Sequence, residues 1–150
     1  RGYYDHELAA RDRFAAEGKE EIWNLLETDS RARVIAIGRH TESLYLPCCV
    51  QTYEDVTGSQ GNVMLVKTMD NFVEFLDYAK TDYIYIEAGY MAEGERTDTL
   101  TCDLVEYGIL TPVCYENGNV LARVDVHGEK TEGSEEKLVE FKQNRRLQEP

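Results

Sequence analysis

The chain has 150 residues, of which 42% are hydrophobic and 30% charged, a balance that favours one folded domain with a single core. Acidic residues outnumber basic residues by 29 to 16, which gives a formal net charge of −13. Such a charge repels nucleic acid phosphates, so we expect no nucleic acid partner. No stretch reaches the roughly 18 apolar residues that a membrane-spanning helix needs.

The first segment is predicted to be helical. Residues 3–27 are rich in Ala, Glu, Arg and Leu, and their apolar residues recur at helical spacing near the end. Gly18 is a candidate break within this helix. The chain begins with Arg1 rather than Met, so we expect it to be cut from a longer protein. We assign residues 1–30 to an N-terminal helical arm.

Short apolar runs predict the central strands. Residues 32–38 form one that closes with glycine, which is typical of a strand buried on both faces. Further strands are predicted within 48–53, 62–68 and 83–87. In the last of these, tyrosines and isoleucines alternate, so the two residue types should occupy opposite faces.

The remaining segments predict two helices and a hairpin. A helix should follow Thr68, capped by Asp70 or Asn71. Thr97 or Asp98 should cap a second helix, which should end at Gly108. Two β-rich runs between residues 110 and 126 flank Asn-Gly, the strongest short signal for a hairpin turn. The charged tail that follows contains a candidate short helix at 134–147.

Alternation of strands and helices predicts an α/β fold. We expect a three-layer sandwich with a mostly parallel, Rossmann-like sheet of about four or five strands. A C-terminal antiparallel β-hairpin should form its edge. In this division residues 31–127 are the α/β domain and residues 128–150 are a charged C-terminal tail.

The cysteines and histidines are not spaced as a metal site. Cys48, Cys49, Cys102 and Cys114 are expected to be reduced core residues, with a disulfide between the last two left open. The histidines at 6, 40 and 127 are too scattered for a zinc site. We therefore expect no metal and no cofactor.

Polar residues follow two of the predicted strands. Arg39, His40 and Glu42 come after Gly38, and Glu87 ends the strand at 83–87. In open α/β sheets ligands bind beyond the carboxyl ends of strands, so these four residues are candidate ligand-binding residues. The glycine spacing of a phosphate loop is missing, and the sequence does not establish that a nucleophile meets a base. No catalytic residue is assigned, and the acidic loop at 88–98 is expected to be solvated.

Three segments carry a resemblance to a known family. The run "ARVIAIG" over 32–38, the run "DYIYI" over 82–86 and the segment from Gly108 to Val124 with its Asn-Gly turn follow one another in this order. This pattern resembles the C-terminal soluble extracytoplasmic domain of bacterial multi-pass membrane glycosyltransferase-like proteins of the GT-C type. Arg123 stands where such domains carry an aromatic residue. The catalytic carboxylates of these transferases are expected between membrane spans, so none is carried over to this chain.

The resemblance implies a non-catalytic accessory domain at the extracytoplasmic face of the cell membrane. It would help acceptor access or assembly, with the transmembrane part of the same parent chain as partner and carbohydrate or a lipid-linked sugar as ligand. The parent, not this fragment alone, would be the glycosyltransferase.

Two alternatives stay open. One is a stand-alone, cytoplasmic small-molecule-binding domain or enzyme that uses the loops after Gly38 and Ala88. The other is a protein-interaction module that uses the hairpin edge. The oligomeric state is left open.

Overall fold

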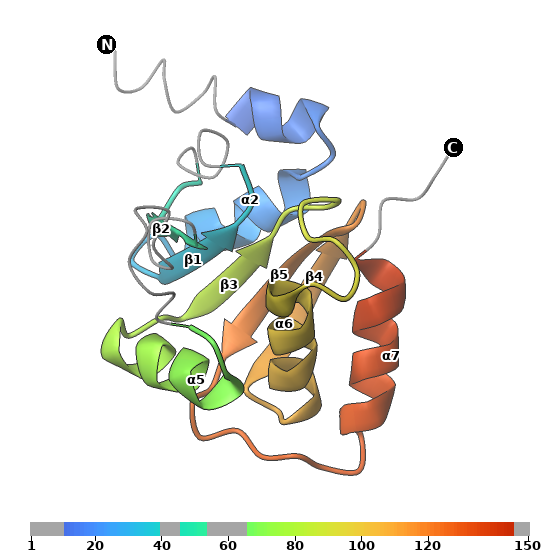
Figure 1. The fold of residues 1–150 in the computed structure, drawn as a ribbon. Helices are drawn as coiled ribbons and strands as arrows, with labels where there is room; N and C mark the ends of the chain where they lie inside the picture. Colours follow the sequence, from blue (N-terminus) through green and yellow to red (C-terminus); the bar gives the residue numbers. More distant parts are fainter. Residues whose placement is uncertain (1–10, 40–45, 54–65, 146–150) are drawn as a thin grey trace.

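The computed structural model describes residues 11–39, 46–53 and 66–145, and within them the α/β class is confirmed. Figure 1 shows an open, mixed sheet whose five strands lie in the order β2-β1-β3-β5-β4. The strands are β1 (Arg33–Ile37), β2 (Cys49–Thr52), β3 (Tyr83–Ile86), β4 (Leu110–Glu116) and β5 (Asn119–Val124). The helices are α2 (Glu20–Thr28), α5 (Met69–Tyr78), α6 (Arg96–Glu106) and α7 (Ser134–Asn144).

Strand β1 lies between β2 and β3 and runs parallel to both. Strand β5 is antiparallel to β3, and β4 is antiparallel to β5. The described sheet therefore has two parallel and two antiparallel pairs. Because Ile37 is in register with Ile86, the carboxyl ends of β1 and β3 lie side by side. This register brings the residues that follow the two strands together.

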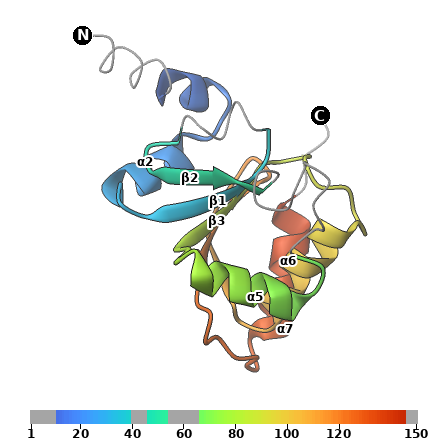
Figure 2. The ribbon, with the colours of Figure 1, turned by 60° about the vertical axis from the view of Figure 1, so that its left-hand side comes forward.

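Apolar side chains cover both faces of the sheet. Figure 2 shows α5, α6 and α7 on one side and α2 on the other. Ile84 and Ile86 pack in the hydrophobic core under α5, α6 and α7, whereas Tyr83 and Tyr85 pack in the core under α2. The alternation in the sequence predicts this division between the two faces. The charged segment after residue 128 is part of this packing, because Phe141 of α7 is fully buried.

Local signals set the ends of the helices. The predicted first helix is interrupted at Gly18, whose φ is +74°, and α2 begins two residues later. The helix at 69–78 is capped by Thr68, whose side chain accepts from the Asn71 N–H at 3.1 Å; the prediction of Asp70 or Asn71 as cap was wrong. An N-cap side chain accepts from the first N–H groups from its place just before the first turn, and Asp70 and Asn71 both lie inside that turn.

Helix α6 begins at Arg96, with Glu95 at the N-cap position. The prediction of Thr97 or Asp98 as cap was wrong, because both residues lie within the first turn of α6. Its end was predicted correctly. The Gly108 N–H bonds to the Val105 carbonyl at 3.2 Å and the Ile109 N–H to the Leu104 carbonyl at 2.9 Å. Gly108 has a φ of +76°, so this is the Schellman arrangement that glycine permits.

A two-residue turn joins β4 to β5. Asn117 and Gly118 both have positive φ, 52° and 85°, the combination found in type I′ turns between antiparallel strands. Helix α7 follows the strand pair in the chain. Most of the strand predicted at 62–68 lies outside the described residues.

Strand β4 forms one edge of the described sheet, whereas β5 is paired on both sides. Pro112 lies in β4, and the register shifts between Pro112 and Cys114. A proline and a bulge both interrupt the row of hydrogen-bonding groups that an added strand would need.

All four cysteines are free thiols. Cys102 belongs to the core on the α6 face and Cys114 to the core on the α2 face, so the sheet separates them. Cys49 is exposed and Cys48 is partly buried, which departs from the expectation of four core cysteines. The two residues follow Pro47, and Cys49 is the first residue of the edge strand β2. One side of an edge strand has no neighbouring strand to cover it.

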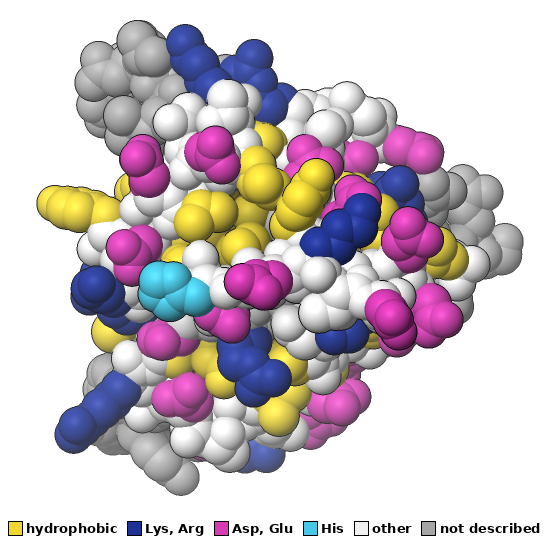
Figure 3. Space-filling view, turned by 90° about the horizontal axis from the view of Figure 1, so that it is seen from below, with side chains coloured by type: hydrophobic (Ala, Val, Ile, Leu, Met, Phe, Trp, Pro, Cys, Tyr) yellow, Lys and Arg dark blue, Asp and Glu magenta, His cyan; other side chains and the backbone are white. Residues whose placement is uncertain are grey.

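The surface carries charges of both signs. Figure 3 shows one face of the molecule, on which Lys and Arg side chains are interspersed with Asp and Glu side chains. On this face the basic side chains do not form the continuous stripe that nucleic acid binding uses.

Candidate functional site

Glu87 stands at the carboxyl end of β3 and is only 6% exposed. Strand β3 is buried on both faces, and its hydrogen bonds to β1 extend to Glu87, whose N–H donates to the Ile37 carbonyl at 2.9 Å. The side chain is therefore fixed beside the end of β1. A buried carboxylate needs charged or polar partners, and Glu87 has them.

Arg39 supplies most of these partners. Its backbone N–H donates to Glu87 Oε2 at 3.0 Å, and its guanidinium donates to Oε1 from Nη2 at 3.1 Å and from Nε at 3.2 Å. The pair forms because β1 and β3 are adjacent and parallel, which is the reason the sequence placed both residues among the candidates. The Arg39 side chain as a whole remains 61% exposed, so it can also contact a ligand.

Lys19 is a second cation beside Glu87. Its Nζ lies 3.2 Å from Glu87 Oε1 and 3.1 Å from Glu17 Oε2. Its side chain is only 6% exposed and its ammonium lies 5.5 Å from the centre of the Phe14 ring. Sequence reasoning missed Lys19 and Glu17, because they precede α2 and are 68 or more residues away from Glu87 in the chain. The nearest signal was Gly18, which marked a turn there.

The surroundings of Glu87 favour its charged form. Burial acts to raise the pKa of Glu87, but the hydrogen bonds from Arg39 and the charge of Lys19 outweigh it and hold this pKa below its ordinary value. Glu87 is thus a carboxylate at neutral pH. In this form it accepts hydrogen bonds through both oxygens.

Asn119, the first residue of β5, holds the loop that follows Glu87. Its Oδ1 accepts from the Ala88 N–H at 2.9 Å and from the Tyr85 hydroxyl at 3.4 Å, while its Nδ2 donates to the Glu116 carbonyl at 2.9 Å. Burial first, and then the charges of nearby carboxylates, raise the pKa of Tyr85, so its hydroxyl remains a donor. Tyr85 is fully buried.

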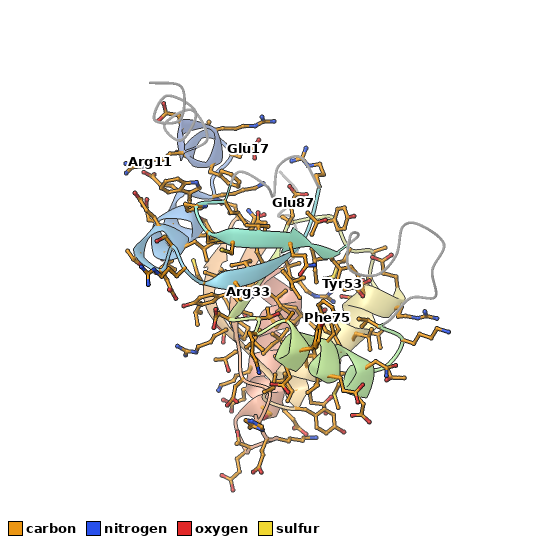
Figure 4. All side chains as sticks on the ribbon, turned by 90° about the vertical axis from the view of Figure 1, so that its left-hand side faces the viewer. Arg11, Glu17, Arg33, Tyr53, Phe75 and Glu87 are labelled. Atoms are coloured by element: carbon orange, nitrogen blue, oxygen red, sulfur yellow. The ribbon has the colours of Figure 1, made fainter. Side chains whose placement is uncertain are left out.

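These residues line a cavity of about 520 Å³ at the carboxyl ends of β1 and β3. Figure 4 shows Glu17 and Glu87 on one side of the strands β1 and β2 and Phe75 of α5 on the other. The cavity is lined by Glu17, Lys19, Arg39, Glu87, Ala88, Gly89, Tyr90, Asn117 and Asn119. Two carboxylates and two cations therefore face it, and their formal charges cancel.

Two acidic residues near the loop at 88–98, Glu95 and Asp98, bind backbone groups of that loop and do not line this cavity. Glu95 accepts from the Ala92 N–H, and Asp98 accepts from the Gly94 N–H, both at 2.9 Å. Asp98 also forms a buried ion pair with Arg145. Among the described residues no group of three or more His, Cys, Asp or Glu side chains could hold a metal ion.

Two of the four candidate residues can be placed, and the structure brings them together: Arg39 and Glu87. His40 and Glu42 lie outside the described residues.

Within the part of the chain that the structure describes, no helix has the length and apolar character needed to cross a bilayer. In comparisons with known proteins, no family model, no curated protein and no solved structure matches this chain.

Proposed function

We propose that the chain is a non-catalytic accessory domain that binds carbohydrate in the cavity at the carboxyl ends of β1 and β3. In this proposal its parent is a membrane-embedded glycosyltransferase-like protein, and the domain lies outside the cytoplasmic membrane, where it helps an acceptor or a lipid-linked sugar reach the transferase. The finer description of the fold belongs to the same proposal: a Rossmann-like three-layer sandwich that ends its sheet in a C-terminal hairpin.

The observation that carries the proposal is the chemistry of the cavity. A carboxylate, a guanidinium and two amides, from Glu87, Arg39, Asn117 and Asn119, face a volume of about 520 Å³. This volume is within the range of small-molecule sites. Both donors and acceptors are present, and the formal charges cancel, which suits a neutral ligand with many hydroxyl groups better than a phosphate. Tyr90 adds an aromatic ring on which an apolar sugar face can stack.

The state of Glu87 supports a binding role over a catalytic one. A general acid or base works best when its pKa lies near the operating pH. Arg39 and Lys19 move the pKa of Glu87 in the opposite direction, below its ordinary value. A carboxylate of this kind orients hydroxyl groups without taking up their protons.

The membrane-bound parent is supported by where the resembling segments lie. The three runs correspond to β1, β3 and the pair β4–β5, which form four of the five strands of the sheet. The cavity lies at the ends of β1 and β3 and beside the turn between β4 and β5. In this proposal the resemblance and the cavity concern the same part of the molecule.

The test is a titration of the ¹⁵N-labelled chain with glucose, galactose, mannose and N-acetylglucosamine, followed by amide chemical shifts. We expect saturable shifts at Ala88, Gly89 and Asn119. Arg39→Gln should weaken binding at least fivefold, whereas Arg123→Gln, which removes an exposed cation at the other end of β5, should not. Absence of saturable shifts with every sugar would refute the carbohydrate ligand. Robust sugar hydrolysis or transfer by the chain alone would refute the non-catalytic role.

The cavity also favours a second candidate function, a stand-alone small-molecule-binding domain or enzyme in the cytoplasm. In that case the ligand need not be a sugar. A thermal-shift screen with nucleotides, amino acids and sugars separates the two, because a ligand that binds only the folded state raises Tm. The hairpin-edge hypothesis receives less support, because Pro112 and the adjacent register shift interrupt the edge strand β4.

A further inference from the structure

Two parts of the chain that are distant in sequence meet at the cavity. Residues 11–28, which we call the N-terminal segment, supply Glu17 and Lys19, while the sheet supplies Arg39 and Glu87. The sequence analysis assigned residues 1–30 to an N-terminal helical arm. The contacts of Lys19 place part of that arm at the candidate site.

Polar contacts hold the segment against the turn between β4 and β5. Asn117 Nδ2 donates to the Gly18 carbonyl at 2.8 Å. A Cβ atom on Gly18 would lie 2.4 Å from that same Nδ2, so a side chain there would displace the Asn117 amide. The φ of Gly18, +74°, also strains any residue other than glycine. The Glu116 carboxylate accepts from the backbone N–H groups of Glu21 and Ile22 at 2.9 and 3.0 Å.

Apolar contacts hold the segment against the sheet. Phe14, Ile22, Trp23 and Leu26 are all buried in the core on this face, together with Tyr85 and Leu121 of β3 and β5. The segment therefore has an anchor that does not depend on Lys19. A change at Lys19 can alter the site without releasing the whole segment.

Lys19 links the position of the segment to the state of Glu87. An ammonium group with a side chain only 6% exposed needs charged partners, and it finds them in Glu17 and Glu87. Conversely, Glu87 keeps one of its two cations only while the segment is in place. Each group is satisfied by the other, so displacement of the segment changes the site and a change at Glu87 affects the segment.

We infer that the N-terminal segment forms one half of the binding site, with Lys19 as a positioning residue that fixes the Glu87 carboxylate for the ligand. Docking of the segment and binding of the ligand are then coupled, and the coupling is reciprocal. A ligand that contacts Glu87 favours the docked segment, and movement of the segment away from the sheet lowers affinity. This inference rests on the proposed function for its ligand, but the coupling itself can be measured without one.

The first test uses amide hydrogen exchange in the absence of ligand. Gly18→Ala should raise exchange at least tenfold both at Ile22, in the segment, and at Arg39, whose N–H donates to Glu87. Gly94→Ala is the matched control, because Gly94 also has a positive φ, +84°, but a Cβ there meets nothing within 4 Å. It should leave both amides unchanged. Faster exchange at Ile22 with no change at Arg39 would overturn the coupling.

The second test separates positioning from mere packing. Lys19→Met keeps the length of the side chain and its contact with Phe14 but removes the charge, whereas Lys19→Arg keeps the charge. The Glu87 carboxyl is titrated by ¹³C NMR in each variant. We expect the pKa of Glu87 to rise in Lys19→Met and to return towards the wild-type value in Lys19→Arg. The same pKa in all three proteins would overturn the role given to Lys19.

Sugar titrations of the same variants distinguish this inference from the proposed function. Lys19→Met should weaken binding of the sugar that binds wild type at least fivefold, and Lys19→Arg should restore part of it. If no sugar binds wild type while the exchange and pKa tests succeed, the carbohydrate proposal fails and the two-part site stands. If sugar binding is equal in all variants, the two-part site fails and the carbohydrate proposal stands.

Discussion

The Glu116 carboxylate at the end of β4 accepts a hydrogen bond from the backbone N–H of Ile22, 94 residues earlier in the chain, at 3.0 Å. Its other oxygen accepts from the Glu21 N–H at 2.9 Å. Lys19, at the N-cap position of α2, makes no side-chain cap bond. A strand residue thus provides the cap that the helix lacks in its own sequence, and its negative charge lies at the positive end of the helix dipole.

Loss of this remote cap should destabilise the protein. We expect Glu116→Ala to lower the free energy of unfolding by about 1 kcal/mol, the usual cost of removing a cap. The measurement is urea unfolding at pH 7, with Glu74→Ala on the exposed face of α5 as control. The control should change stability by less than about 0.5 kcal/mol. Equal effects of the two substitutions would argue against a capping role for Glu116.

The second prediction concerns the start of α5. Thr68→Ala should cost about 1 kcal/mol, because Thr68 Oγ1 accepts from the Asn71 N–H. Asn71→Ala should have little effect or should stabilise, because Ala is the better helix former inside the first turn. Thermal unfolding of the two variants decides between the caps. A larger loss for Asn71→Ala would restore the assignment made from sequence.

The sequence predicted correctly those features that a few neighbouring residues determine. The strand at Arg33–Ile37 and the turn at Asn117–Gly118 each carry their signal within a few residues. The meeting of Arg39 and Glu87 was also within reach, because it requires only that two predicted strands be parallel neighbours. The turn between β4 and β5 needed only the ability of Asn and Gly to adopt positive φ.

The rest of the site depends on packing between distant segments. Lys19 lies in a stretch of mixed charge, and nothing nearby in the sequence indicates that its ammonium is buried. Its burial follows from docking of α2 on the sheet face and from Gly18 against Asn117, 99 residues away. Asn119 likewise reads as a turn residue, although its side chain holds Ala88. No period or local motif encodes such contacts.

The third prediction concerns the cysteines. Cys102 and Cys114 belong to cores on opposite faces of the sheet, so a disulfide between them would require the fold to rearrange. After purification without reductant and alkylation in denaturant, we expect no cross-linked peptide that contains both residues. The same digest after reduction serves as the control. Recovery of the cross-linked peptide from folded protein would contradict the packing of α6 and β4.

The last prediction is a dependence of stability on pH that originates at Glu87. The pKa of Glu87 in the folded protein lies below its ordinary value of 4.5. The ionised carboxylate therefore stabilises the fold above pH 4.5, and this contribution is lost as the pH falls through the lowered folded-state pKa. Glu87→Gln should be less stable than wild type at pH 7, because Lys19 loses a buried partner.

The difference in the free energy of unfolding between wild type and Glu87→Gln should become smaller as the pH falls below 4.5. Protonation of Glu87 in wild type then removes the same charge that the substitution removes. Urea unfolding of both proteins at pH 7, 5, 4 and 3 measures this difference. Glu74→Gln is the control, because Glu74 is exposed on α5. The free energy of unfolding of this variant should differ little from that of wild type at every pH. A difference for Glu87→Gln that stays constant down to pH 3 would mean that the carboxylate is not held in its charged form by Arg39 and Lys19.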